Sequence, residues 1–446
     1  MVTDRQGNSV SGASGEAAAL YDQALWAFNI YRGDPVALLD SAVAAAPDFA
    51  MATIMKAHLY ALSTEPEGLT EAANLVATAK TLTLNEREAS HIAALELLLR
   101  NEWSAAAIAL DRHNLTWPRD LLAIQSGHLM DFFRANARDM RDRIARVLPQ
   151  WSAAIPGYSF LLGFQSFGLE EAGDYARAEA AGRQALTLEP LDCWAHHAVA
   201  HVMEMQGRFQ DGLGWMIARE PHWTGDDNFF QVHNWWHRAL YHFELGEIDQ
   251  ILALYDGPIR SGRSAVAVDL VDASALLWRL QLAGHDVGDR WVELTAAWDP
   301  IGDGKLYPFN DLHAVMAHLG AGREADVERI LACYRETARS ESEVAGWVHD
   351  YGLPLIEGFA AFWRGDHATA TERLYGARYI ANGFGGSHAQ RDVIDWTLTE
   401  ASLRGGQKIL AEGLAQERLA AKPHSPINLG FLKRARSQAL GVQDAA

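Results

Sequence analysis

Five side chains that can bind metal ions or transfer protons lie in two short stretches of this chain. The first stretch holds His197, His201 and Glu204, and the second holds His233 and His237. The histidines of each stretch are four residues apart, so on a helix each pair shares one face and converges on one point. Imidazole is a common transition-metal ligand and a general acid or base near neutral pH. The spacing therefore predicts a functional site and leaves the reaction open.

Three interpretations of these groups remain open. The imidazoles and the carboxylate can form a metal site, with Asp269 or Asp272 adding an oxygen ligand or orienting an imidazole. Without a metal, a histidine held by an aspartate can work as a general acid or base in a pocket walled by Trp194, Trp235 and Trp236. Alternatively, the histidines only bond backbone carbonyls and acids inside a helical wall. A divalent metal is the one cofactor considered, and no residue is assigned as its ligand, because the pattern is not HExxH.

The composition is that of a large, acidic, globular protein. The chain has 446 residues, 49% of them hydrophobic, and a formal net charge of −19. This charge repels phosphate backbones, which excludes nucleic acid as the main partner. No apolar run reaches the roughly 18–20 residues of a membrane span, and residues 1–16 do not have the pattern of a secretory signal. Cys193 and Cys333 form no CxxC motif, so we expect a soluble, cytoplasmic protein with no membrane partner.

Apolar residues recur at helical spacing along nearly the whole chain, which predicts an all-α fold. Short breaks that contain glycine interrupt this pattern. Each break lies where a first helix would end and an antiparallel partner would begin, with glycine in the left-handed cap. The glycines of these breaks are Gly33, Gly173, Gly207, Gly246, Gly284, Gly322 and Gly365.

One stretch, 167–190, matches a tetratricopeptide repeat. Counting back from Pro190 puts Ala178 and Ala185 at the two positions where paired helices touch, and the next break follows 34 residues after Gly173, which is the period of this repeat. The sequence thus predicts tetratricopeptide-like helix pairs stacked into a right-handed superhelix, an α-solenoid. We expect a flexible lead over 1–16, a single repeat domain over 17–424, and a capping helix and tail over 425–446.

The two histidine stretches fall on the predicted first helices 191–206 and 229–245 of consecutive repeats. First helices line the concave surface of such arrays, so the two stretches should be neighbours on the inner wall. Aligning the helices by their terminal glycines, however, places His197 opposite Trp236. The pairs are then about one residue, or roughly 100°, out of phase. Either the register absorbs this offset or the two pairs do not converge.

A further helix is predicted to begin just after Pro308. Asn310 or Asp311 would serve as its N-cap, and His313 would be a candidate for the inner wall.

Another predicted helix follows two glycines and runs to about Leu403. Ser387 and Gln390 form a capping box at its start, and Arg391 beside a helix N-terminus can bind an anion. The alternative role of Arg391 and Asp392 is a partly buried ion pair between adjacent repeats.

Taken together, these motifs resemble the tetratricopeptide repeat protein 38 family over roughly residues 150–430. The resemblance implies a helical-repeat fold but no particular reaction. It also implies that polar residues lie on the first helices of successive pairs, as a closed pocket requires. The motifs that carry it are Asp192-x-Trp-x-x-His197-x-x-x-His201-x-x-Glu204-Met205, His233-Asn-x-Trp-His237-x-Ala-Leu-Tyr241, Val271-Asp272 with Leu277-x-Arg-Leu280, Asn310-Asp-x-His313, Asp350-x-Gly-Leu-Pro354, and Gly385-Gly-Ser-x-Ala-Gln-Arg-Asp392.

The sequence favours a pocket that binds a small polar or anionic molecule and transforms it by acid–base or metal-assisted hydrolysis or elimination. An enzyme of this kind would be a hydrolase or a lyase. The alternative is a scaffold that binds a protein or peptide without catalysis, and homo-oligomerisation is left open. The expected catalytic residues are His197, His201, Glu204, His233, His237 and Asp272. The expected substrate-binding residues are Trp194, Asn234, Trp236, Tyr241, Asn310, His313, Arg391 and Asp392.

Overall fold

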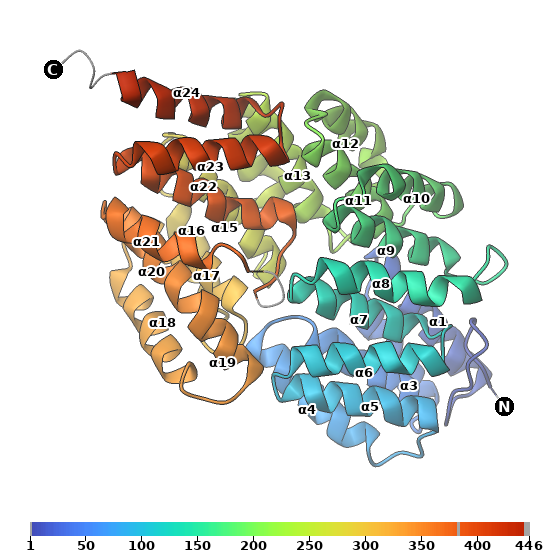
Figure 1. Cartoon of the computed structure of the whole chain (residues 1–446). Helices are drawn as coiled ribbons and strands as arrows, with labels where there is room; N and C mark the ends of the chain where they lie inside the picture. The colour runs from blue at the N-terminus through green and yellow to red at the C-terminus, as the bar shows by residue number, and fades with distance from the viewer. Residues whose placement is uncertain (1, 381–383, 441–446) are drawn as a thin grey trace. The chain divides into compact units, whose positions relative to one another are not determined.

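The computed structural model of the chain describes residues 2–380 and 384–440, and it is all-α, as predicted. Consecutive helices run antiparallel in pairs joined by short loops (Figure 1). In the described residues the β-type contacts are two isolated bridges, Thr3 with Ser9 and Arg32 with Asn228. Over the same residues, no helix has the length and apolar character needed to cross a membrane.

The chain divides into two compact units. The first comprises Met1–Val199 and Glu220–Gln231, and the second comprises Ala200–Arg219 and Val232–Ala446. The dividing points fall inside α11 (Cys193–Met205) and α12 (Phe209–Trp223) and after the first residue of α13 (Gln231–Glu244). The predicted single domain over 17–424 and its superhelical winding therefore stay predictions.

The first unit consists of helix hairpins in chain order. Its helices are α1 (Gly15–Ile30), α2 (Pro35–Ala45), α3 (Ala50–Ala61), α4 (Pro66–Ala79), α5 (Glu86–Leu99), α6 (Trp103–Thr116), α7 (Leu121–Phe133), α8 (Ala137–Val147), α9 (Tyr158–Glu171) and α10 (Tyr175–Leu188). A single 3₁₀ turn, Leu148–Gln150, follows α8.

The second unit continues the hairpin pattern from α13 onward. Its helices are α13 (Gln231–Glu244), α14 (Ile248–Leu254), α15 (Ala267–Leu282), α16 (Arg290–Trp298), α17 (Pro308–Gly320), α18 (Glu324–Thr337), α19 (Glu343–Trp347), α20 (Leu353–Trp363), α21 (His367–Ala377), α22 (His388–Arg404), α23 (Lys408–Ala421) and α24 (Pro426–Leu440). Short π-helical turns, Tyr255–Ile259 and Val348–Gly352, follow α14 and α19. Helix α24 begins at Pro426, as predicted, and packs on α23. Residues 441–446, the last part of the predicted capping helix and tail, lie outside the described residues.

The hairpin of α9 and α10 shows why these residues fold as pairs. Gly173 has a φ of +82°, a left-handed conformation that favours glycine, and the Asp174 side chain then caps the next helix. Ala178 and Ala185 are fully buried at the predicted contact positions. All seven glycines expected in left-handed caps have positive φ: Gly33, Gly173, Gly207, Gly246, Gly284, Gly322 and Gly365.

The N-terminal segment expected to be a flexible lead holds buried side chains. Asp4, Gln6 and Val10 are buried, and the Gln6 side-chain amide donates a hydrogen bond of 3.0 Å to the carbonyl of Pro156. Residues before α1 thus contribute to the packing of the first unit, and their flexibility stays a prediction.

Candidate functional site

Helices α11 and α13 occupy the two predicted histidine stretches and bring three imidazoles together in the second unit. The Nε2 atom of His237 lies 3.0 Å from Nε2 of His201 and 3.1 Å from Nε2 of His233. The metal-binding atoms of these three residues lie within 4.8 Å of one another, and all three side chains are buried. The rotational offset that the terminal glycines predicted between the two helices therefore does not keep the histidines apart, and both helices contribute to one cluster.

A hydrogen bond between the two helices holds this register. The hydroxyl of Tyr241 on α13 donates to the carbonyl of Ala200 on α11 at 2.6 Å. The Tyr241 ring also fills the space beside Gly212 of α12, where an added Cβ would lie 2.2 Å from a ring carbon. Tyr241 thus joins three helices, and a role in substrate binding stays a prediction.

Two buried carboxylates lie beside the Nδ1 atoms of the clustered histidines, on the side opposite their Nε2 atoms. Asp272 of α15 has its Oδ2 atom 2.7 Å from Nδ1 of His233, and Glu204 of α11 has its Oε2 atom 3.5 Å from Nδ1 of His237. A carboxylate at Nδ1 places the ring proton there. With its proton on Nδ1, the Nε2 atom of His233 presents a lone pair to the centre of the cluster.

Two residues not expected from the sequence complete this arrangement. The side-chain amide of Gln390, on α22, donates to Oδ1 of Asp272 at 3.4 Å. The ammonium group of Lys422, which follows α23, lies 2.6 Å from Oε1 of Glu204. Both partners are far away in the sequence, so no local pattern indicates them.

Burial and charge determine the protonation of the cluster. Burial lowers the pKa of His237 well below its usual value, and the neighbouring His201 adds to this effect. Burial works to raise the pKa of Glu204, but the positive charge of Lys422 and the contact with His237 hold it below its usual value. The cluster therefore combines a neutral imidazole with an ionised carboxylate.

Two expected site residues on the N-terminal part of α11 belong to the first unit. The His197 ring stacks on Phe167 with centroids 5.3 Å apart, one helical turn before His201. Trp194 is buried among aromatic rings, with Phe167 and His128 each 4.9 Å away. Trp194 thus occupies an aromatic core in this unit, and its substrate contact stays a prediction.

The two neighbouring tryptophans of α13 differ in burial. Trp236 is fully buried and stacks on His233 at 5.4 Å, and the guanidinium of Arg279 lies 5.5 Å from the centroid of the Trp236 ring. Trp235 is partly exposed beside Arg238, and its place in the wall of a pocket stays a prediction. Asn234 between them is buried.

The residues expected at the start of α17 have other roles. The N-cap of α17 is Tyr307, not Asn310 or Asp311, because Pro308 occupies the first helical turn. Nδ1 of His313 donates to the carbonyl of Phe309 in its own helix at 2.8 Å, which is the structural role weighed for these histidines. Burial lowers the pKa of His313 to about 4.

The start of α22 is a structural cap, as predicted. Ser387 and Gln390 form the capping box, and the Arg391 guanidinium bonds the carbonyl of Gly386. Asp392 pairs with Arg418 of α23, with Oδ1 and Nη1 2.9 Å apart. Asp392 thus forms the interhelical ion pair considered above, while anion binding by Arg391 stays a prediction.

Comparison with known proteins does not assign the chain to a family. The crystal structure of the APC/C hetero-tetramer Cut9–Hcn1 is similar over 94% of this chain and 76% of that chain, with a TM-score of 0.44 and 15% sequence identity. The chain is an all-α protein of antiparallel helix pairs with a buried histidine cluster. No family model matches the chain, so membership of the tetratricopeptide repeat protein 38 family stays a prediction.

Proposed function

We propose that His201, His233 and His237 bind one divalent transition-metal ion. The observation that carries this proposal is the convergence of three Nε2 atoms at separations of 3.0 and 3.1 Å from His237. An imidazole nitrogen has either one proton or one lone pair, so Nε2 of His237 cannot make two linear hydrogen bonds to its neighbours. A cation accepts all three lone pairs at once.

The outer contacts of the cluster support metal binding over a purely structural role. Metal-binding histidines almost always donate their second ring N–H to a carboxylate, a carbonyl or water. Asp272 is placed to accept this proton from His233, and Glu204 lies on the same side of His237. Gln390 and Lys422 in turn hold the two carboxylates.

Zinc is the ion whose preferences this donor set meets best. Zinc takes imidazole nitrogens at about 2.0–2.1 Å in a tetrahedral arrangement, and neutral histidines suit it. Three protein ligands leave a fourth position for water or for a small polar or anionic molecule. A metal-bound water there would support hydrolysis or elimination.

The direct test is the metal content of the full chain expressed with added zinc. We expect the His233→Gln/His237→Gln variant to lose one equivalent of zinc relative to the unmodified protein. His242→Gln is the matched control, because His242 lies on the same helix but pairs with Glu247 at 2.6 Å, and it should retain that equivalent. Equal zinc content in all three proteins would refute the proposal.

The reaction class is tested on the zinc-loaded protein. We expect it to hydrolyse small phosphate or carboxylate esters, and we expect the His233→Gln/His237→Gln variant to be inactive. Zinc binding without turnover would restrict the proposal to a structural metal.

A further inference from the structure

The first unit contains a second group of metal-binding side chains, which no local sequence pattern indicates. His91 lies on α5, His113 lies on α6, and Asp120 caps the N-terminus of α7. Their ligand atoms lie within 4.8 Å of one another, and all three side chains are buried. Three successive helices thus each supply one group to the same point.

The distances in this group are close to those of a bound metal ion. Oδ2 of Asp120 lies 3.0 Å from Nε2 of His91 and 3.2 Å from Nε2 of His113. Two ligands bonded to zinc at about 2.1 Å in a tetrahedral arrangement are about 3.4 Å apart. An outward shift of a few tenths of an ångström would therefore admit the ion. We propose that His91, His113 and Asp120 form a second binding site for a divalent transition-metal ion.

The outer ring nitrogens of both histidines have acceptors in place. Nδ1 of His113 lies 3.1 Å from the hydroxyl of Ser90, and Nδ1 of His91 lies 3.1 Å from Nε2 of His58. When Nε2 binds the metal, the ring proton moves to Nδ1 and is donated to these partners.

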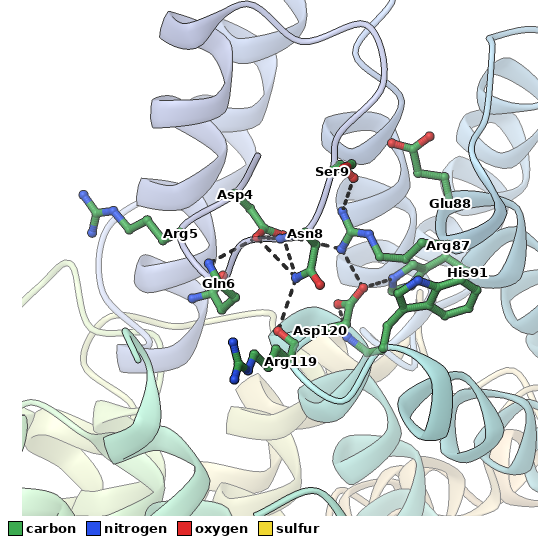
Figure 2. A network of polar contacts seen from close by, with 12 residues as sticks. Asp4, Arg5, Gln6, Asn8, Ser9, Arg87, Glu88, His91, Arg119 and Asp120 are labelled. Carbon is green, nitrogen blue, oxygen red and sulfur yellow. Dashed lines mark hydrogen bonds and ion pairs between the residues drawn. The ribbon is translucent and has the colours of Figure 1, made fainter. Parts of the chain in front are cut away.

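The local charge also favours a further cation. Two buried carboxylates, Asp4 and Asp120, flank the buried guanidinium of Arg87 (Figure 2). Arg119, drawn beside them, is exposed. Among Asp4, Asp120 and Arg87, negative charges outnumber positive charges by one, so a further cation would compensate the buried negative charge. Buried charges are stable only when they are compensated.

Arg87 is the group that a metal must displace from Asp120. Its Nη1 atom lies 2.6 Å from Oδ2 of Asp120 and 3.5 Å from Oδ2 of Asp4, and its Nη2 atom donates to the carbonyl of Ser9 at 3.2 Å (Figure 2). Arg87 can therefore leave Asp120 for Asp4 while remaining paired. Metal binding would then strengthen the attachment of the N-terminal segment to α5.

The test uses the full chain with His233→Gln/His237→Gln, so its outcome is independent of the function proposed for α13. Titration calorimetry of the chelator-treated protein with Zn²⁺ alone should show one site per chain. Adding His113→Gln should weaken this site at least 100-fold. Adding His128→Gln should leave it within threefold, because His128 is a buried histidine of the same unit outside the group.

The Arg87→Gln variant distinguishes loss of a metal site from a folding defect. Removing the competing cation should tighten Zn²⁺ binding at least tenfold, whereas misfolding would only weaken it. Circular dichroism verifies that each variant is helical. The proposal is overturned if the starting variant binds no zinc, if His113→Gln behaves like His128→Gln, or if Arg87→Gln fails to tighten binding.

Discussion

Substituting Asp272 with asparagine tests how the cluster on α11 and α13 is oriented. Oδ2 of Asp272 lies 2.7 Å from Nδ1 of His233, and Asp272 is fully buried. Asparagine keeps the size and an acceptor oxygen but removes the charge. The difference between a charge-assisted and a neutral hydrogen bond is about 1–2 kcal/mol, which corresponds to a roughly five- to thirtyfold change in affinity. We therefore expect Asp272→Asn to weaken zinc binding by that factor.

The assay is competition for zinc against a chromophoric chelator, with His113→Gln in the background to silence the site in the first unit. Asp269→Asn is the matched control, because Asp269 lies one turn earlier on the same helix, α15, and is also buried. Unchanged affinity in Asp272→Asn, or equal weakening in both variants, would refute the assignment of Asp272 as the orienting group.

Three further predictions concern stability. Lys422→Met leaves the carboxylate of Glu204 buried and uncompensated, so we expect the unfolding free energy measured in urea to fall by about 3–5 kcal/mol. The Lys422→Met/Glu204→Leu double variant should recover this stability, and equal losses in both variants would contradict the prediction. Burial raises the pKa of Asp311 to about 7, so the folded protein binds a proton there that the unfolded chain has released, and stability falls as pH rises from about 4 to 7. Asp311→Asn should abolish this fall, so its advantage in unfolding free energy over the unmodified protein should grow by about 3 kcal/mol from pH 5 to pH 8. A stability difference that does not change with pH would count against this prediction. Gly212→Ala should lower the unfolding free energy by about 1–3 kcal/mol, because its Cβ would lie 2.2 Å from the Tyr241 ring. Gly214→Ala on the same helix meets nothing within 4 Å and should be neutral or stabilising. Equal melting temperatures of the two variants would contradict this prediction.

The fold was largely predictable because its signals are local. Glycines at the breaks and alanines at the contacts of α9 and α10 act within a few residues of one another. The spacing of the histidine pairs likewise indicated which helices carry the cluster. The relative phase of α11 and α13 was not predictable from their terminal glycines, because the bond from Tyr241 to Ala200 spans 41 residues.

The supporting groups of the cluster could not be predicted for the same reason. Gln390 lies 118 residues from Asp272, and Lys422 lies 218 residues from Glu204. The capping box alone explains the presence of Gln390 at this position, so the sequence gives no reason to expect its long-range contact with Asp272. In the first unit, His91 and Asp120 are 29 residues apart, so helical spacing carries no sign of their meeting.

Anomalous diffraction at the zinc absorption edge, from crystals of the full chain grown with zinc, tests the central claim most directly. We predict a peak bonded at about 2.0–2.1 Å to the Nε2 atoms of His201, His233 and His237. A zinc-treated crystal with no anomalous peak among these three imidazoles would contradict the account.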